Sequence, residues 1–298
     1  MAERTPLLPE LERYIPYDKS WMIRMGILDM LHGYDDINRT LDEHDQAALG
    51  TDLQALNHAI KQWREGSTRI DVGESGTLYR FLQFAAWSQG RDAEFIKHGT
   101  LADRPMTHDP SIVHLPLAGL LQLDNGTSQW ASAAVLLGNI EALPEPLPFK
   151  LKATHEALDH WHAAREAGKS WEVRRDETIA AQTAAYLGWL ATGTMVFVPK
   201  QAEDYCFARA FGLMTASEGE AKWPSLRLHE SDRIAAMEDP SAAIASADHR
   251  VVQAVAMHDS LPESAFAHPE AVAKSWPLFW DMHRVALAAI SKAPSHLL

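Results

Sequence analysis

Several segments of this chain combine a helix-capping residue with small, hydroxyl or basic residues at the start of a predicted helix. The densest is residues 228–234, where a glutamate, a serine, an aspartate and an arginine follow one another. Ser231 or Asp232 can cap a short helix here, and Ile234 and Met237 give that helix a buried side. A helix start carries unpaired N–H groups and a partial positive charge, so an adjacent arginine makes it a receptor for an anion.

Taken alone, residues 228–234 fit an ordinary capping box with a solvated arginine equally well. The pattern recurs, however, and the recurrence constrains the fold, because several helix starts are then expected to converge on one anionic site. Glu230, beside such an anion, is placed to transfer a proton. The other segments with this pattern are residues 18–24, 73–80, 127–130 and 248–250.

Length and charge narrow the class of protein. The 298 residues suffice for one large domain or for two domains of ordinary size. A net charge of -13 argues against nucleic acid as a partner, because nucleic-acid binding depends on lysines and arginines that neutralise phosphates. Small anions stay compatible with this charge, since a local cationic pocket can lie within an acidic protein.

The single cysteine, Cys206, excludes an internal disulfide framework and fits a reducing compartment. Its neighbours Tyr205 and Phe207 favour a core residue over a nucleophile. Residues 1–18 contain charges and prolines where a signal peptide needs an apolar run. A membrane span needs about 18 uninterrupted apolar residues, and no stretch of this sequence reaches that length. We therefore expect a cytoplasmic protein.

Helical patterns alternate with short strand-like stretches, which predicts an α/β fold built from repeated units. We expect strands or strand-like pieces at residues 68–72, 112–123, 171–173 and 194–198. Helices are expected at residues 20–31, 42–64, 77–87, 154–167, 176–190, 204–214 and 271–290.

Metal and nucleotide sites find little support in the sequence. His155, His160 and His162 lack the i, i+4 spacing that lets two histidines on a helix bind one metal, and no cysteine or carboxylate stands at ligand spacing from them. The Gly-x-x-x-x-Gly-Lys-Ser/Thr phosphate loop and the dinucleotide motif Gly-x-Gly-x-x-Gly do not occur. We therefore expect no metal site.

In their order along nearly the whole chain, these motifs resemble those of the enolpyruvyl transferase family, most closely the branch that acts on shikimate 3-phosphate. Each motif is weak alone, whereas seven in the family's order indicate homology. Asp248-His249-Arg250 is an intact match. The other six are Asp18-Lys19-Ser20-x-x-x-Arg24, Gly73-Glu74-Ser75-Gly76-Thr77-x-x-Arg80, Asp103-Arg104-Pro105-Met106, Thr127-Ser128-Gln129-Trp130, His229-Glu230-Ser231-Asp232-Arg233 and Ala273-Lys274-Ser275-Trp276-Pro277.

The resemblance implies an activity. It is the transfer of the enolpyruvyl (1-carboxyvinyl) group from phosphoenolpyruvate to the 5-hydroxyl of shikimate 3-phosphate, with release of phosphate, in aromatic amino acid biosynthesis. This reaction needs no metal and no organic cofactor. The implied partners are the two small anionic substrates, without nucleic acid or membrane, and the implied state is a monomer.

The resemblance also implies an α/β (α+β) fold, a two-domain inverse α/β barrel of repeated βαβαββ-like units. The chain is shorter than the family, so its sheets are expected to be trimmed. An upper domain, residues 18–165, would mainly bind the acceptor. A lower domain, residues 1–17 plus 166–298, would complete the phosphoenolpyruvate site in the interdomain cleft.

By the same resemblance, Glu230 protonates the methylene carbon, and Lys19 takes part in catalysis. The base that removes the 5-hydroxyl proton is assigned to Asp204, with Asp176 as second choice, and a plain helix cap is the alternative role for either. Phosphoenolpyruvate would be held by Lys19, Gly76, Arg104, Gln129, Arg233, Arg250 and Lys274. Shikimate 3-phosphate would be held by Lys19, Ser20, Arg24, Thr127, Ser128, Gln129, Asp204 and His229.

Two departures from the family pattern affect the acceptor side. His229 replaces a lysine and is charged only part of the time at neutral pH, and Glu74 replaces an asparagine near the phosphates. Two other functions therefore stay open: enolpyruvyl transfer to a different alcohol, and a shortened paralogue that binds ligand without turnover. The family's UDP-sugar branch is less similar, since residues 98–103 lack its loop cysteine.

Overall fold

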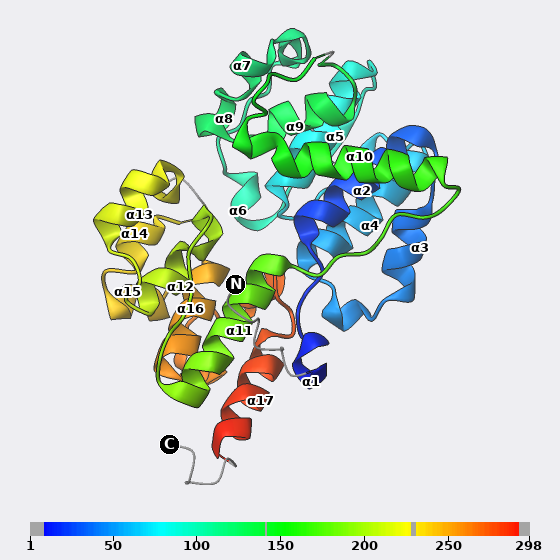
Figure 1. The fold of residues 1–298 in the computed structure, drawn as a ribbon. Helices are drawn as coiled ribbons and strands as arrows, with labels where there is room; N and C mark the ends of the chain where they lie inside the picture. Colours follow the sequence, from blue (N-terminus) through cyan, green and yellow to red (C-terminus); the bar gives the residue numbers. More distant parts are fainter. Residues whose placement is uncertain (1–8, 141, 228–230, 292–298) are drawn as a thin grey trace. The chain divides into compact units, whose positions relative to one another are not determined.

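The chain forms two compact units in the computed structural model, which describes residues 9–140, 142–227 and 231–291 (Figure 1). Unit 2 is one continuous stretch, Tyr17–Arg174, and unit 1 combines Met1–Pro16 with Arg175–Leu298. The chain thus leaves unit 1 near its beginning and returns to it after completing unit 2. The expected upper domain ended at residue 165, whereas unit 2 continues to Arg174 because the indole of Trp171 is bound inside it.

The expected inverse α/β barrel is wrong. The structure is 63% helical and 3% strand. Its described residues contain two short strands, β1 (Arg69–Asp71) and β2 (Glu94–Ile96), which pair in parallel with Ile70 opposite Phe95. Helix α5 (Gly76–Ser88) connects them, so one βαβ unit stands where repeated sheets were expected.

Residues 112–123 do not form strands, because prolines start helical turns there. Pro110 is the first residue of the 3₁₀ helix η2 (Pro110–His114), and Pro116 precedes α7 (Leu117–Leu120). Proline suits the start of a helix, where its missing N–H would have no partner anyway. An apolar run broken by proline was therefore a helix signal at this position.

The expected strands at residues 171–173 and 194–198 also lack a strand partner in the described part of the chain. The first is held by side chains instead: Trp171 Nε1 donates to Asp29 Oδ2 over 3.0 Å, and the Glu172 carbonyl accepts from Trp21 Nε1 over 2.9 Å. Alternating apolar residues show that a segment can form a strand, but they do not supply the second strand.

The remaining elements are helices, none of which, among the described residues, is long and apolar enough to cross a membrane. Those of unit 2 are α2 (Lys19–His32), α3 (Asp36–Glu43), η1 (Gln46–Ala48), α4 (Thr51–Arg64), α6 (Gly99–Ala102), α8 (Leu123–Gly126), α9 (Gln129–Leu136), η3 (Phe149–Leu151) and α10 (Lys152–Glu166). Those of unit 1 are α1 (Pro9–Glu12), α11 (Glu177–Thr192), η4 (Ala202–Asp204), α12 (Tyr205–Ala210), α13 (Ala216–Lys222), η5 (Pro224–Arg227), α14 (Arg233–Ala236), α15 (Pro240–Ile244), α16 (His249–Asp259), η6 (Glu263–Ala265), η7 (Pro269–Lys274) and α17 (Phe279–Ser291).

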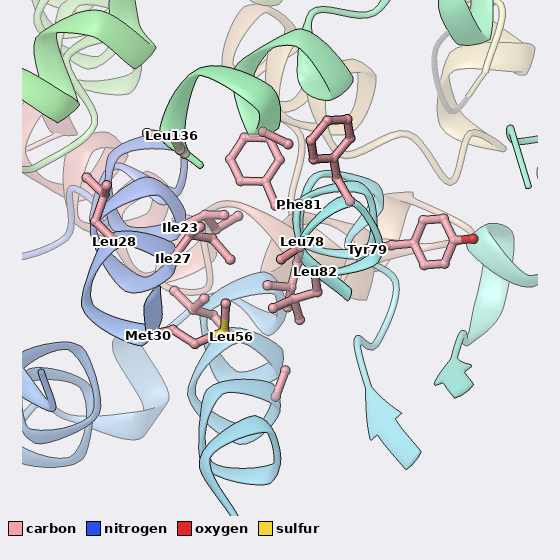
Figure 2. Close-up of a cluster of buried hydrophobic side chains, with 14 of the residues drawn as sticks. Ile23, Ile27, Leu28, Met30, Leu56, Leu78, Tyr79, Phe81, Leu82 and Leu136 are labelled. Carbon is pink, nitrogen blue, oxygen red and sulfur yellow. The ribbon is translucent and has the colours of Figure 1, made fainter. Parts of the chain in front are cut away.

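Helix α2 is the centre of unit 2. Every residue from Trp21 to Met30 is buried, so this helix has no solvent-facing stripe along most of its length. Figure 2 shows side chains of α2, such as Ile27, directed toward Leu56 of α4 and Leu82 of α5. A Cβ at Gly26 would lie 3.1 Å from Leu56 Cδ1, so the glycine allows α2 and α4 to approach closely.

Asp29 is a charged residue in the middle of this buried helix. Its Oδ1 accepts from Trp161 Nε1 over 2.9 Å and from Arg165 Nη2 over 2.6 Å. Its Oδ2 accepts from Trp171 Nε1 over 3.0 Å and from the Ile37 amide over 2.9 Å. A buried carboxylate is costly without partners, and these four donors satisfy both oxygens while tying α2 to α3, to α10 and to the segment after α10.

Unit 1 has its own hydrophobic core, in which α12 packs on α16. The N-terminal segment belongs to this core, because Leu11 and Ile15 are buried within it. Trp276, near the other end of the chain, donates from Nε1 to the Tyr14 carbonyl over 2.6 Å. The core of unit 1 is therefore completed by residues from both ends of the described chain.

Candidate functional site

In unit 2, polar side chains gather where α5 and α9 begin. Arg80, one turn into α5, donates from Nη1 to Gln129 Oε1 over 2.6 Å and to the Gly76 carbonyl over 3.3 Å. Gln129 Nε2 in turn donates to Thr77 Oγ1 over 2.6 Å. A Cβ at Gly76 would lie 3.2 Å from Nη1 of both Arg80 and Arg104, so the glycine leaves room for two guanidinium groups. We call Gly76, Thr77, Arg80, Arg104 and Gln129 the arginine cluster.

The arginine cluster concentrates positive charge at two helix starts. Burial is the main cause that lowers the pKa of Arg80 below its ordinary value, and repulsion from nearby Arg104 adds to it, whereas the ion pair with Asp124 opposes it. Arg104 is half-buried, and its Nη2 donates to Thr100 Oγ1 over 3.4 Å. Two guanidinium groups beside helix N-termini suit a phosphate or a carboxylate. The structure thus brings together Gly76, Arg104 and Gln129, three of the predicted phosphoenolpyruvate ligands.

Arg24 is a second buried cation linked to the first turn of α9. Its Nη1 donates to the carbonyl of Ser20 over 2.8 Å and to its hydroxyl, and its Nε donates to Thr154 Oγ1 over 2.9 Å. Thr154 Oγ1 donates to Ser132 Oγ over 2.9 Å. Burial lowers the pKa of Arg24 to about 10, although Asp18 acts to raise it. The predicted acceptor ligands Ser20 and Arg24 are therefore neighbours.

The other predicted acceptor ligands of unit 2 have different surroundings. Lys19 Nζ forms an ion pair with Asp52 Oδ2 over 3.1 Å, and Asp52 lies in the first turn of α4. Thr127 Oγ1 accepts from the Gln129 amide over 3.4 Å. Ser128 stands at the N-cap of α9, and its hydroxyl makes no capping hydrogen bond. Thr127 and Ser128 thus directly precede Gln129, which is a member of the arginine cluster.

Asp124 holds the arginine cluster in place, and sequence reasoning missed it. Its Oδ2 accepts from Arg80 Nε over 2.7 Å and from Trp130 Nε1 over 2.9 Å, and its Oδ1 accepts from the amide and the hydroxyl of Thr107. Burial acts to raise the pKa of Asp124, but the hydrogen bonds from Arg80, Thr107 and Trp130 hold it below its ordinary value. The available signal was an acid directly before Asn-Gly, a dipeptide typical of turns.

We expect Asp124→Asn to lower the free energy of unfolding by about 2–3 kcal/mol at pH 7, because a hydrogen-bonded charge is removed from beside a buried arginine. Since folding lowers the pKa of Asp124, its contribution is present above the unfolded value of 3.8 and is lost as the pH falls through the lower folded value. Urea unfolding at pH 7 and at about pH 3 measures this difference, which should shrink in acid. Asp42→Asn, at an exposed ion pair with Lys61, is the control and should cost less than about 1 kcal/mol.

In unit 1, α14 and α16 bring two sequence motifs together. Arg233 Nε donates to Asp248 Oδ2 over 2.8 Å, and Arg233 Nη2 donates to Asp248 Oδ1 over 3.3 Å, with both side chains buried. Ser231 Oγ donates to Asp248 Oδ2 over 3.0 Å, and the Arg250 amide donates to Oδ1 over 2.9 Å. Asp248 therefore caps α16 and binds Arg233 at the same time.

Arg250 differs from Arg233 in its contacts. It is 6% exposed, and its Nη1 is buried without a hydrogen-bond partner in the described part of the chain. Gln253, one turn later on α16, has a buried Oε1 that also lacks a partner there, while its Nε2 donates to Ser275 Oγ over 3.4 Å. Ser275 directly follows Lys274, the last residue of η7, which packs on α16. An unpartnered buried donor and acceptor on one helix favour a bound polar group at this position.

Sequence reasoning also missed Gln253. It stands three residues after Arg250, a spacing that places two side chains on the same face of a helix. A polar residue at this spacing from a candidate ligand, within an otherwise apolar stretch, was the signal that could have found it.

Both candidate bases cap helices. Asp204, which is buried, accepts from Gln182 Nε2 over 2.9 Å and from the amides of Lys200 and Gln201 over 2.8 and 3.2 Å. Asp176 is half-buried and caps α11 through one amide hydrogen bond of 2.9 Å. Asp204 therefore has three donors on its oxygens, whereas Asp176 has fewer partners.

His229 and Glu230 lie outside the described residues. The carboxylate of Glu74 lies against Gly99, where a Cβ would approach Glu74 Oε1 to 1.9 Å. Burial raises the pKa of Cys206 to about 12, which fits a core residue, although the charges of Arg233 and Arg250 act to lower it. Among the described residues, no three His, Cys, Asp or Glu side chains are grouped so that they could hold a metal ion.

No protein-family model, curated protein or solved structure matches the chain.

Proposed function

We propose that this protein transfers the enolpyruvyl group from phosphoenolpyruvate to the 5-hydroxyl of shikimate 3-phosphate and releases phosphate. The observation that carries the proposal is the arginine cluster. Gly76, Arg104 and Gln129 come from separate motifs, and the fold places them within one group at the starts of α5 and α9. Arginine suits this task, because its planar fork donates two hydrogen bonds to one oxyanion.

The cations of unit 1 support the same proposal. Arg250 and Lys274, assigned to phosphoenolpyruvate, lie on α16 and η7, which pack on each other. Arg250 Nη1, buried without a hydrogen-bond partner among the described residues, is a donor that a carboxylate or phosphate oxygen would satisfy. The residue types therefore fit a substrate with two anionic groups.

In the proposed reaction, the 5-hydroxyl oxygen bonds to C2 of phosphoenolpyruvate, its proton passes to a carboxylate, and Glu230 gives a proton to C3. The C2–O bond to phosphate then breaks, C3 loses a proton, and phosphate leaves. Cations offset the charge of the tetrahedral intermediate, which still carries both the phosphate and the carboxylate. Both substrates are soluble metabolites, and we assign the reaction to the cytoplasm.

Ligand binding without turnover is the second candidate. The observation that favours it concerns Asp204, whose oxygens accept three hydrogen bonds that already give it a capping role. A general base must reach the proton that it removes, and each donor on its oxygens takes up one acceptor site. Asp176 accepts one amide hydrogen bond, from Ile179. If the wild-type protein turns over and Asp204→Asn still does, Asp176 would be the base.

The test is an assay of phosphate release from phosphoenolpyruvate with and without shikimate 3-phosphate. Release that requires shikimate 3-phosphate supports the proposal, and release only with another alcohol, such as a UDP-sugar, assigns a different acceptor. Calorimetric binding of shikimate 3-phosphate without release supports the second candidate. A protein that neither binds shikimate 3-phosphate nor releases phosphate would contradict both candidate functions.

A matched pair of arginine variants sharpens the assay. Arg104→Ala should lower phosphate release about 30-fold, because a charge-assisted hydrogen bond of about 2 kcal/mol is lost. Arg69→Ala removes an exposed arginine of the same unit, paired with Glu94 over 3.2 Å, and should leave release unchanged. Equal losses in the two variants would show that overall charge, not the arginine cluster, controls the rate.

A further inference from the structure

Residues 194–198 of unit 1 have the surface of a β-strand without being part of a sheet. The segment links α11 to η4 and α12 (Figure 1), and its burial alternates residue by residue. Met195 and Phe197 pack against the core of unit 1, and the Phe197 ring lies 5.0 Å from that of Phe207. Val196 and Val198 point outward and are 76% and 73% exposed. A period of two is the signature of an extended chain with one buried face.

The backbone of this segment is unpaired within the described part of the chain. The N–H and C=O groups of Met195, Val196, Phe197 and Val198 make no hydrogen bond within residues 9–140, 142–227 and 231–291. At the two ends of the segment, the Thr194 amide donates to the Thr192 hydroxyl, and the Pro199 carbonyl accepts from Lys222 Nζ. Such a row of donors and acceptors is a template for another strand.

Residues 194–198 lack two of the usual protections of an edge strand. Exposed edges normally carry a charge, a proline or a covering element. Residues 194–198 contain neither a charged residue nor a proline, and their sequence, Thr-Met-Val-Phe-Val, has high β-propensity. The first proline and the first charge come only afterwards, at Pro199 and Lys200.

We propose that residues 194–198 pair in antiparallel orientation with the same residues of a second copy of this chain. A two-fold axis at Val196 places Met195 opposite Phe197 and Thr194 opposite Val198. The two exposed valines of each copy then lie on one face of the two-stranded ribbon, where β-branched cross-strand pairs are favourable. Lys200 lies beyond the paired residues, so no like charges meet.

A second copy is favoured over a differently charged partner because of the surrounding surface. Residues 178–199, which comprise most of α11 and the proposed strand, contain no charged side chain, although 22% of the whole chain is charged. Two molecules with a net charge of -13 repel each other, and they can approach best through an uncharged face. A basic partner would instead be expected to bind at acidic residues, which this stretch lacks.

The paired area is small, so the dimer is expected to be weak. Stable interfaces bury about 1,200–2,000 Å² in total, more than a five-residue strand pair supplies. The association should therefore depend on protein concentration over the micromolar to millimolar range, in contrast to the monomer that the family resemblance implies.

Sedimentation measured over this concentration range gives the first test. The wild-type mass should rise from 33.2 kDa toward twice that value. Val196→Lys places two lysines opposite each other and should raise the dissociation constant at least 10-fold. Phe149→Lys replaces an equally exposed apolar residue of unit 2, 72% exposed, and should leave the dissociation constant unchanged. A wild-type protein that stays monomeric throughout, or equal effects of the two variants, would overturn the proposal.

Disulfide trapping gives the register. Val196→Cys puts two thiols directly opposite each other, within the Cα separation that a disulfide allows, and oxidation should give a covalent dimer. Val198→Cys is the control, because its two copies would lie about 14 Å apart, four residues along the ribbon. The native Cys206 is buried and does not compete. Equal trapping at both positions would refute the register. Slow amide exchange at Val196 in the monomer would show that another segment of the same chain covers this strand, and this result would also overturn the proposal.

Discussion

Asp29→Ala is expected to lower the free energy of unfolding by about 3–5 kcal/mol, the range for removing one partner from a buried charged network. The substitution leaves two indole N–H groups, an amide and a guanidinium inside unit 2 without their acceptor. Each buried donor without a partner is costly, and the cavity left by the carboxylate adds to the loss. Because α2, α3 and α10 all depend on this one side chain, the loss should affect the whole of unit 2.

Denaturant unfolding followed by tryptophan fluorescence measures this effect, since Trp161 and Trp171 both donate to Asp29 and report on their own surroundings. Asp92→Ala replaces an exposed aspartate of the same unit and should change the midpoint little. Asp29→Asn keeps part of the acceptor capacity and should lie between the two. A loss below about 1 kcal/mol for Asp29→Ala would show that α2 is held by apolar packing alone.

Arg250→Met is expected to lower phosphoenolpyruvate-dependent phosphate release about 100-fold without lowering stability. The activity loss corresponds to one or two hydrogen bonds to a charged substrate group, at about 1.5–3 kcal/mol each. Stability should be unchanged or slightly higher, because Arg250 Nη1 is buried without a partner in the described chain and methionine fills a similar volume.

Arg233→Met provides the contrast for this prediction. It removes the guanidinium that binds Asp248 through two hydrogen bonds. It should therefore lower the free energy of unfolding by about 3–5 kcal/mol, in addition to any loss of phosphate release. Parallel thermal unfolding and phosphate-release measurements on both variants separate the two roles. If Arg250→Met unfolds as readily as Arg233→Met, Arg250 supports the fold and its assignment to a substrate is wrong.

The helices of this protein were largely predictable because their signals are local. Periodicity and capping placed a helix at residues 20–31, where α2 runs from Lys19 to His32, and Asp176 was correctly identified as the cap of α11. The expected helix at 42–64 is divided, because Gly50 starts α4 and the chain before it turns through η1. Local signals thus give the kind of element more securely than its ends.

The sheets and the supporting acids were not predictable for the opposite reason. A strand needs a partner from elsewhere in the chain, and residues 194–198 show the pattern without a partner strand among the described residues. Likewise, the motifs pointed to the cations Arg80 and Arg104. The supporting acids lie far from their partners in the sequence: Asp124 is 44 positions from Arg80, and Asp52 is 33 positions from Lys19. No pattern within a short window records such pairings, so the acids that hold the cations were missed.

The chain's return to unit 1 has a consequence during synthesis on the ribosome. Unit 2 is contiguous and can form as soon as it has emerged, but Leu11 and Ile15 must wait for Trp276 and its neighbours. At about 5–20 residues per second, the 260 residues from Tyr17 through Trp276 take roughly 13–52 seconds to translate. During that interval the apolar side chains of Leu11 and Ile15 stay uncovered, and transiently exposed apolar surface of this kind favours aggregation.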